Sequence, residues 1–315
     1  MATTSRGTIP EEYLDHECIH CHRYAFRHDD NTQRAARSIK MQDRGVDNST
    51  PQNRPSQIFH QTTWNSNTNS HESSVHQETD CIKIVCIADT HNGHRDPGFN
   101  QKLRQICGDI LIHAGDFSNR GTISEITDVF DWLSKLDNFK YKVVIAGNMD
   151  GIGLDKGDRH NADYMRQYFR GFPENIIYLE NNMKNVLGIN IYGCPYTPQF
   201  YGGFQYIPKS LQATRLWNQI PEDCDILVSH GPPSDVLDKT SKGQHVGCNV
   251  LRQAIQQRPR LKAVVFGHIH HSFGCQLIEN KWFINAAQYN GIFHRDRENQ
   301  PFEIMMRRDD KKIAN

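Results

Sequence analysis

Short, nearly continuous apolar runs recur along the chain from residue 81 onward, and they predict the strands of a buried sheet. The first run, residues 82–87, is rich in β-branched side chains, which is typical of a strand covered on both faces. Similar runs predict strands at residues 109–114, 141–146, 176–179, 186–192, 225–229 and 261–266. Residues 276–278, 282–286 and 302–306 are expected to form a closing antiparallel meander.

Helical spacing appears between several of these runs. Residues 122–125 read Thr-Ile-Ser-Glu, a capping box, and apolar residues follow it every three or four positions. Residues 210–220 and 250–257 suit further helices, residues 92–97 a polar loop, and residues 151–175 a loop with a short helix. Strands that alternate with helices, followed by strands alone, predict an α/β sandwich with a mostly β core and helices on its outer faces.

The first 79 residues differ in composition from the rest of the chain. Residues 43–77 are mostly Asn, Ser, Thr, Gln, His and Pro, so they cannot bury enough apolar surface to offset the entropy lost on ordering. We therefore expect a disordered tail at residues 1–79, a folded domain at residues 80–307 and a short polar tail at residues 308–315.

Histidines and cysteines cluster within the N-terminal tail. Residues 16–22 contain the pair Cys18 and Cys21 together with three histidines, and such a pair is able to bind zinc. A second ligand pair at finger-like spacing is missing from this segment. We therefore favour a His/Cys-rich segment without a structural metal, such as a partner-binding motif.

Charge and composition narrow the classes of function. The 315 residues include 36 Lys and Arg and 36 Asp and Glu, so net charge favours neither a nucleic-acid partner nor an acidic one. Hydrophobic residues make up 37%, which is low for a compact chain and agrees with an unfolded tail. The nine cysteines form no dense disulfide framework and no signal peptide is recognisable, which predicts a reduced, cytoplasmic protein. No apolar run approaches the roughly 18 residues of a membrane-spanning helix.

Polar residues follow the predicted strands at their carboxyl ends, where open α/β sheets place their ligand sites. They are Asp89, His91, Asp116, Asn148, His230, His268 and His270. These oxygen and nitrogen donors, with no thiolate among them, suit manganese, iron, zinc or magnesium. Seven ligands are too many for one ion but enough for two ions that share a bridging carboxylate. Two cations about 3.5–4 Å apart are able to activate a water and to hold the oxygens of a phosphate.

The order of these elements is more specific than any one of them. Asp-x-His is common by chance and Gly-Asp after a strand is usually a turn, but five matched elements in one order are hard to obtain by accident. The order Asp-x-His, Gly-Asp, Gly-Asn-x-Asp, His-Gly and Gly-His-x-His resembles that of the calcineurin-like metallophosphoesterase superfamily. Five segments are similar to those of metallophosphoesterase domain-containing (fetal-brain-239-like) proteins: residues 112–117, 228–233, 246–248, 267–270 and 284–286. The resemblance covers residues 81–307.

The resemblance implies a four-layer α/β/β/α sandwich and a phosphodiesterase that acts on cyclic nucleotides or related phosphodiesters. It assigns Asp89, His91 and His270 to one metal ion and Asn148, His230 and His268 to the other, with Asp116 bridging. It also implies a preference for manganese, attack by a hydroxide that bridges the two ions, and catalytic roles for Asp116, Asn148, Asp150 and His230. The implied partner is a small-molecule phosphoester or nucleotide.

One position departs from the family pattern. The motif Gly-Asn-His-Asp/Glu reads Gly-Asn-Met-Asp at residues 147–150, so Met149 replaces the histidine that faces the leaving group. A thioether neither donates a proton nor stabilises anionic phosphate oxygens well. We expect metal binding to survive and turnover to be slow. The alternative function is a nucleotide- or metal-binding regulator with vestigial catalysis.

Two other groups of residues are candidates to contact a substrate. His94 and His271 lie close to motifs and could replace the lost proton donor, although each is more simply interpreted as a solvated loop residue. Aromatic residues between Tyr196 and Tyr206 could stack on a base, although ordinary loop packing explains them more simply.

Overall fold

The computed structural model describes residues 81–155, 159–288 and 299–307. The tails predicted at residues 1–79 and 308–315, with Cys18 and Cys21, lie outside these ranges. None of the helices in the described ranges is long and apolar enough to cross a membrane.

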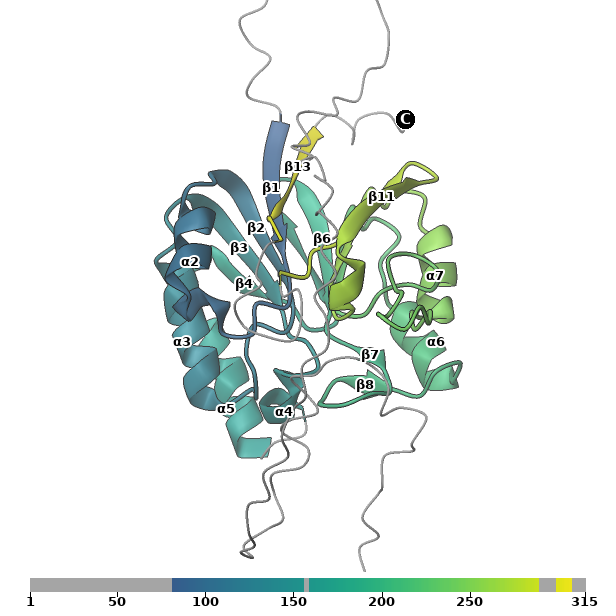
Figure 1. Cartoon of the computed structure of the whole chain (residues 1–315), viewed down its shortest axis with the longest axis horizontal. Helices are drawn as coiled ribbons and strands as arrows, with labels where there is room; N and C mark the ends of the chain where they lie inside the picture. Colours follow the sequence, from purple (N-terminus) through teal and green to yellow (C-terminus); the bar gives the residue numbers. More distant parts are fainter. Residues whose placement is uncertain (1–80, 156–158, 289–298, 308–315) are drawn as a thin grey trace, which may run out of the picture. The chain divides into compact units, whose positions relative to one another are not determined.

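The first sheet contains the strands that precede the first three motifs. β1 (Cys81–Ile87), β2 (Gly108–Ala114), β3 (Phe139–Ile145) and β4 (Ile176–Tyr178) run parallel in that order. β13 (Phe302–Arg307) lies antiparallel to β1 at one edge (Figure 1). Ile84 pairs with Ile110, and Ile110 pairs with Tyr141, so the strands that precede the motifs are in register with one another. Their carboxyl ends therefore meet along one edge of the sheet.

The second sheet has the strand order β11-β12-β10-β9-β6-β5. Its four inner strands run parallel: β6 (Ile189–Cys194), β9 (Ile226–Ser229), β10 (Ala263–Phe266) and β12 (Lys281–Asn285). β5 (Asn182–Val186) and β11 (Gly274–Ile278) close the two edges in antiparallel orientation. His230 directly follows β9 and Gly267 directly follows β10, so this sheet also carries its motifs at carboxyl ends.

Helices cover the outer face of each sheet (Figure 1). α2 (Pro97–Arg104), α3 (Ile123–Ser134) and α5 (Arg159–Arg170) cover the first sheet, and α6 (Leu211–Trp217) and α7 (Asn249–Gln256) cover the second. Short elements follow the motifs: η2 (Gly93–Arg95), α4 (Gly151–Leu154) and η3 (His270–Ser272). β7 (Thr197–Pro198) and β8 (Gln205–Tyr206) follow β6 and precede α6 in the sequence, and they form a separate two-stranded sheet. The four-layer α/β/β/α sandwich is therefore confirmed.

Alternate residues of each strand belong to different apolar clusters. On β1, Val85 and Ile87 pack outward against the helices, whereas Ile84 and Cys86 pack into the layer between the sheets. The second sheet contributes residues such as Val228 to the same middle layer. Because both faces of these strands are buried, the strands read as continuous apolar runs in the sequence.

The predicted antiparallel meander at the end of the domain is wrong in one of its two pairings. β12 lies parallel to β10, and β13 joins the first sheet beside β1, so only β11 and β12 form an antiparallel hairpin. Phe302, Ile304 and Met306 of β13 pack against the middle layer, and burial of that face places the strand beside β1. Residues 186–192 form parts of two strands, because Leu187 and Gly188 turn the chain with φ angles of 52° and 91°.

Helical content is higher than predicted at two places. Residues 92–97, predicted as a loop, contain η2 and the first residue of α2, whose first turn is capped by the Asp96 carboxylate. α5 has 12 residues, where a short helix was predicted. Short helices of polar composition gain most of their stability from the surface that they pack against, so the sequence alone understates them.

Backbone hydrogen bonds join the carboxyl ends of the two sheets. The Ala88 N–H donates to the Ala286 carbonyl at 2.9 Å, and the Gln288 N–H donates to the Ala88 carbonyl at 2.8 Å. β1 and β12 belong to different sheets, so this pairing draws both sets of strand ends to one place. The motif residues of both sheets meet there.

Candidate metal centre

The first motif lies in a strained turn directly after β1. Asp89, His91 and Asn92 have left-handed φ angles of 52°, 45° and 61°. Such angles cost about 1–3 kcal/mol each outside glycine and persist only where other contacts enforce them. Here the three N–H groups donate, in order, to the carbonyl groups of residues 115, 116 and 117. The loop after β1 is therefore locked against the loop after β2, which carries Asp116.

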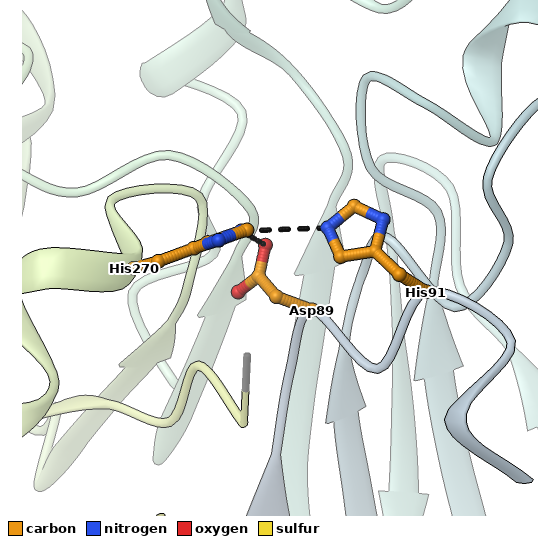
Figure 2. Close-up of side chains that lie close together, drawn as sticks. All are labelled: Asp89, His91 and His270. Atoms are coloured by element: carbon orange, nitrogen blue, oxygen red, sulfur yellow. Dashed lines mark hydrogen bonds and ion pairs between the residues drawn. The ribbon is translucent and has the colours of Figure 1, made fainter. Parts of the chain in front are cut away.

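A first group of ligand atoms comes from both sheets. Asp89 and His91 belong to the first sheet and His270 to the second, and their ligand atoms all lie within 4.8 Å of one another (Figure 2). The His270 Nε2 lies 3.3 Å from the Asp89 Oδ1 and 3.4 Å from the His91 Nε2. A carboxylate and two imidazoles that point toward one point form a donor set suited to a divalent ion.

A second group consists of Asp89, Asp116 and His230, again within 4.8 Å. The His230 Nδ1 donates to the Ala114 carbonyl at 2.9 Å, so the Nε2 of the neutral imidazole carries a lone pair. That lone pair faces two further acceptors, the Asn148 Oδ1 at 3.0 Å and the Asp116 Oδ1 at 3.4 Å. These three groups converge on one point that either a proton on the Nε2 or a metal ion can occupy, so the residues fit a metal ion.

Asp116 lies between the two groups and has one oxygen toward each. Its Oδ1 lies 3.4 Å from the His230 Nε2, and its Oδ2 lies 3.8 Å from the His91 Nε2. The Met149 N–H donates to the same Oδ1 at 2.8 Å and holds the carboxylate in place. This geometry suits the bridging role that the resemblance implies for Asp116.

Asn148 and His268 border the second group. The His268 ring lies 5.1 Å from the His230 ring, and the backbone of His268 has a φ of 68°. The His268 N–H donates to both Asp89 oxygens at 2.9 and 3.0 Å. The structure therefore brings all seven predicted ligands to one centre.

Neighbouring charges set the protonation states of the buried ligands. Burial opposes ionisation of Asp89 and Asp116, but nearby His270 and His230 hold the pKa values of both carboxyls below their usual range. Burial lowers the pKa of His268 to about 3. Burial also opposes the charge on His230, yet the Asp116 carboxylate raises its pKa to about 9. The carboxylates are thus charged and His268 neutral at neutral pH, as metal ligation requires, whereas His230 must release a proton when an ion binds.

The motifs and their order match a known family. Residues 82–272, more than half of the chain, match the sequence model of the calcineurin-like phosphoesterases. The chain belongs to the calcineurin-like phosphoesterase family. All seven candidate ligands fall within the part that matches the calcineurin-like phosphoesterases.

Several known proteins are similar in sequence to this chain. Metallophosphoesterase domain-containing protein 1 of Homo sapiens is 37% identical over 223 residues, which cover 65% of this chain and 65% of that protein. The chain therefore spans just under two thirds of that relative's length. The UPF0046 protein K07C11.7 of Caenorhabditis elegans is 32% identical over 222 residues, with 67% of this chain and 71% of that protein covered. One solved structure is similar in fold alone, with a TM-score of 0.50 and 17% identity over 65% of this chain and 90% of its own.

Asp150, the last residue of the third phosphoesterase motif, accepts hydrogen bonds from the loops that carry Asp116 and Asn148. Its Oδ2 accepts the N–H groups of Gly147 at 2.9 Å and Phe117 at 3.2 Å, and its Oδ1 accepts the N–H and the hydroxyl of Ser118. Burial and the nearby Asp116 carboxylate raise the pKa of Asp150 to about 8. These contacts make Asp150 a positioning residue, and a direct catalytic role for it stays a prediction.

The candidate proton donors lie in different environments. Met149, at the position of the missing histidine, is 1% exposed. The His94 Nε2 lies 2.8 Å from the Asp128 carboxylate of α3, and the His94 ring packs against Trp132. His94 is therefore buried, which corrects its interpretation as a solvated residue, whereas His271 is exposed as expected.

The aromatic residues between Tyr196 and Tyr206 divide into two kinds. Tyr196 packs edge-on against Phe204, and Tyr206 against Trp217, so ordinary packing accounts for them. Phe200 lies edge-on to the His268 ring at 5.6 Å. Phe200 thus borders the candidate metal centre.

Sequence reasoning missed two asparagines that hold the ligand loops. The Asn92 Nδ2 donates to the Glu125 carboxylate at 2.8 Å, which ties the first motif to α3. The Asn285 Nδ2 donates to the carbonyls of Ile269 at 2.9 Å and Leu237 at 3.1 Å. Each asparagine lies at or just after the end of an apolar run, as the ligands do. This placement was the sequence signal that could have identified the two asparagines.

Proposed function

We propose that this chain is a metal-dependent phosphoesterase that uses two divalent ions. The observation that carries the proposal is the convergence of ligand atoms at His230, whose Nε2 lies 3.0 Å from the Asn148 Oδ1 and 3.4 Å from the Asp116 Oδ1. Membership in the calcineurin-like phosphoesterase family supports the reaction type.

The seven ligands divide into two sets around Asp116. Asp89, His91 and His270 would hold one ion, and Asn148, His230 and His268 the other. A pair of divalent ions, when bound, lowers the pKa of a coordinated water and neutralises charge on phosphate oxygens.

The residues of the chain orient the ligands before any ion arrives. The Ala114 carbonyl selects the tautomer of His230 that presents Nε2, and the Met149 N–H orients the Asp116 carboxylate. The His268 N–H orients Asp89 in the same way. Such partners behind the ligands raise metal affinity and fix geometry, because less reorganisation accompanies binding.

We further propose phosphodiesters, including cyclic nucleotides, as the substrates and manganese as the favoured ion. Similarity of the five motifs to those of phosphodiesterases supports the substrate class, and the oxygen and nitrogen donors support manganese. Met149 offers no proton to a leaving group. Activated aryl esters, whose leaving groups need no proton, are therefore expected to react faster than alkyl esters.

A substrate panel tests this proposal. The full chain, loaded with manganese, magnesium or zinc, is assayed with bis(p-nitrophenyl) phosphate, p-nitrophenyl phosphate and a cyclic nucleotide. Manganese-dependent cleavage of the diester that is lost in Asp89→Ala is the expected result. Cleavage of the monoester alone would contradict the substrate class.

Metal analysis tests the ligand assignment independently of turnover. Wild type is expected to retain two ions after dialysis, and Asp116→Ala fewer, because the bridging carboxylate is lost. Equal metal content in the two proteins would show that Asp116 does not bridge.

Met149 favours one alternative function, a regulator that binds nucleotides or metal without efficient turnover. Its buried thioether stands at the position of the family's proton donor. Tight binding of a nucleotide by the manganese-loaded chain, with no cleavage of any ester in the panel, would establish this alternative.

A further inference from the structure

We propose that residues 199–204, the loop between β7 and β8, form a positioning element that sets the affinity of the second ion position. This position consists of Asn148, His230 and His268, so the inference rests on the metal assignment of the proposed function. The loop contacts two of these three ligands. It hydrogen-bonds the Asn148 side chain and places the Phe200 ring against His268.

The loop determines which end of the Asn148 amide faces the centre. The Asn148 Nδ2 donates to the Tyr201 carbonyl at 3.0 Å, and the Oδ1 lies on the other side, 3.0 Å from the His230 Nε2. A carbonyl only accepts hydrogen bonds, so it requires the amide nitrogen on its side. Without this partner the amide could turn over and present its nitrogen, which does not bind cations, to the ion.

Glycines bring the loop backbone against the third motif. The Gly203 N–H donates to the Asn148 carbonyl at 2.9 Å. A Cβ at Gly202, whose φ is 91°, would collide with the Asn148 carbonyl oxygen, and one at Gly203 would collide with the Gly151 carbonyl. This close approach requires residues without side chains.

The loop is itself fixed to the domain. Phe204 is fully buried, its N–H donates to the Asp155 carboxylate at 2.8 Å, and its carbonyl accepts the Thr197 N–H. The Gln199 N–H donates to the Tyr206 carbonyl at 2.8 Å. Both ends of the loop are therefore anchored, and the Tyr201 carbonyl has a defined place.

The second position needs this support more than the first because of its charge. Asp89 adds a negative charge to the first position, and Asp116 lies between the two. The ligands that belong to the second position alone are an amide and two imidazoles. Affinity for divalent ions rises with the number of charged ligands. The second position, which has no carboxylate of its own, therefore depends more on how its ligands are oriented.

The test is manganese binding to the metal-free full chain of wild type, Gly202→Ala and Gly188→Ala. Gly188 is a matched control, because its φ is also 91° and a Cβ there would meet nothing within 4 Å. Electron paramagnetic resonance measures free manganese and the spin-coupled pair. In Gly202→Ala we expect an unchanged first dissociation constant and a second one weakened about 10–100-fold, as for other partners of ligand residues. The coupled signal then appears only at higher manganese, and Gly188→Ala behaves as wild type.

Phe200→Ala tests the contact with His268 and leaves the loop backbone in place. It is expected to weaken the second ion and leave the first unchanged. An unchanged second dissociation constant in folded Gly202→Ala would overturn the proposal, as would equal weakening of both ions. If Gly202→Ala does not fold, an unchanged second constant in Phe200→Ala overturns it. Wild type that binds fewer than two ions would instead refute the proposed metal centre.

Discussion

Replacement of Asn285 by aspartate should destabilise the domain in a way that depends on pH. Asn285 is fully buried at the end of β12. Its Nδ2 donates to the carbonyls of Ile269 and Leu237, and its Oδ1 accepts the Ala287 N–H at 3.2 Å. Ile269 lies between His268 and His270, so Asn285 holds the loop that carries both ligands.

The size of the stability loss follows from the two carbonyl groups that the Asn285 amide contacts. An aspartate at this position would put a carboxylate oxygen about 3 Å from two carbonyl oxygens, so the native state would have to keep it protonated. Protonating at pH 7 an acid of pKa about 3.9 costs about 4 kcal/mol. The protonated acid donates one hydrogen bond where the amide donates two, which adds about 1–3 kcal/mol. The total of about 5–7 kcal/mol is comparable to the whole stability of a domain.

Urea unfolding of the metal-free full chain between pH 5 and pH 8 measures this effect, with Asn285→Ala as the control. The introduced acid has a raised pKa in the native state, so native Asn285→Asp binds more protons than its unfolded chain above about pH 4. Its stability should therefore fall as pH rises, by about 1.4 kcal/mol per unit. Asn285→Ala loses the same hydrogen bonds without an ionisable group, and its deficit should not change with pH. Equal deficits for the two variants at every pH would refute the reasoning.

Three further predictions concern the surroundings of the ligands. Burial lowers the pKa of His113 to about 3, so the native state binds fewer protons than the unfolded chain below about pH 6.5. When the pH falls from 7 to 5, the free energy of unfolding in urea should therefore decrease by about 2 kcal/mol more for metal-free wild type than for His113→Gln. Equal decreases in the two proteins would contradict this prediction. Glu125→Ala removes the hydrogen bond to Asn92 together with the capping box of α3, so thermal unfolding should show a stability lower by about 1–3 kcal/mol. The control Ser124→Ala, at the exposed neighbouring residue, should change the stability little. Met149→His should raise turnover of a cyclic nucleotide up to about 10²-fold and that of a nitrophenyl diester less, and equal gains on both would argue against a missing proton donor.

The strands and ligands were predictable from local signals. A parallel strand buried on both faces needs apolar residues throughout, and the run that ends at Val228 is followed at once by Ser229 and His230. The same local rule located Asp89, Asp116 and Asn148. It also predicted the sandwich, because helices must cover the outer faces of two such sheets.

What the sequence did not predict depends on partners distant along the chain. Alternate apolar residues at 302–306 specify one buried face but not the neighbouring strand, and β13 was therefore assigned to the wrong sheet. The left-handed conformations of Asp89 and His91 arise from bonds to the loop after β2. The role of Asn285 depends on Leu237 and Ile269, which reach it only in the folded domain.

The division of the ligands between the sheets has a consequence for the order of events during biosynthesis. Each close group combines residues of the N-terminal half of the domain, Asp89 with His91 or Asp116, with one histidine of the C-terminal half, His270 or His230. A nascent chain that has released only β1 to β4 therefore lacks a complete set for either ion. High affinity appears only after the second sheet has been synthesised and docked, so ion capture is a late event that reports correct assembly.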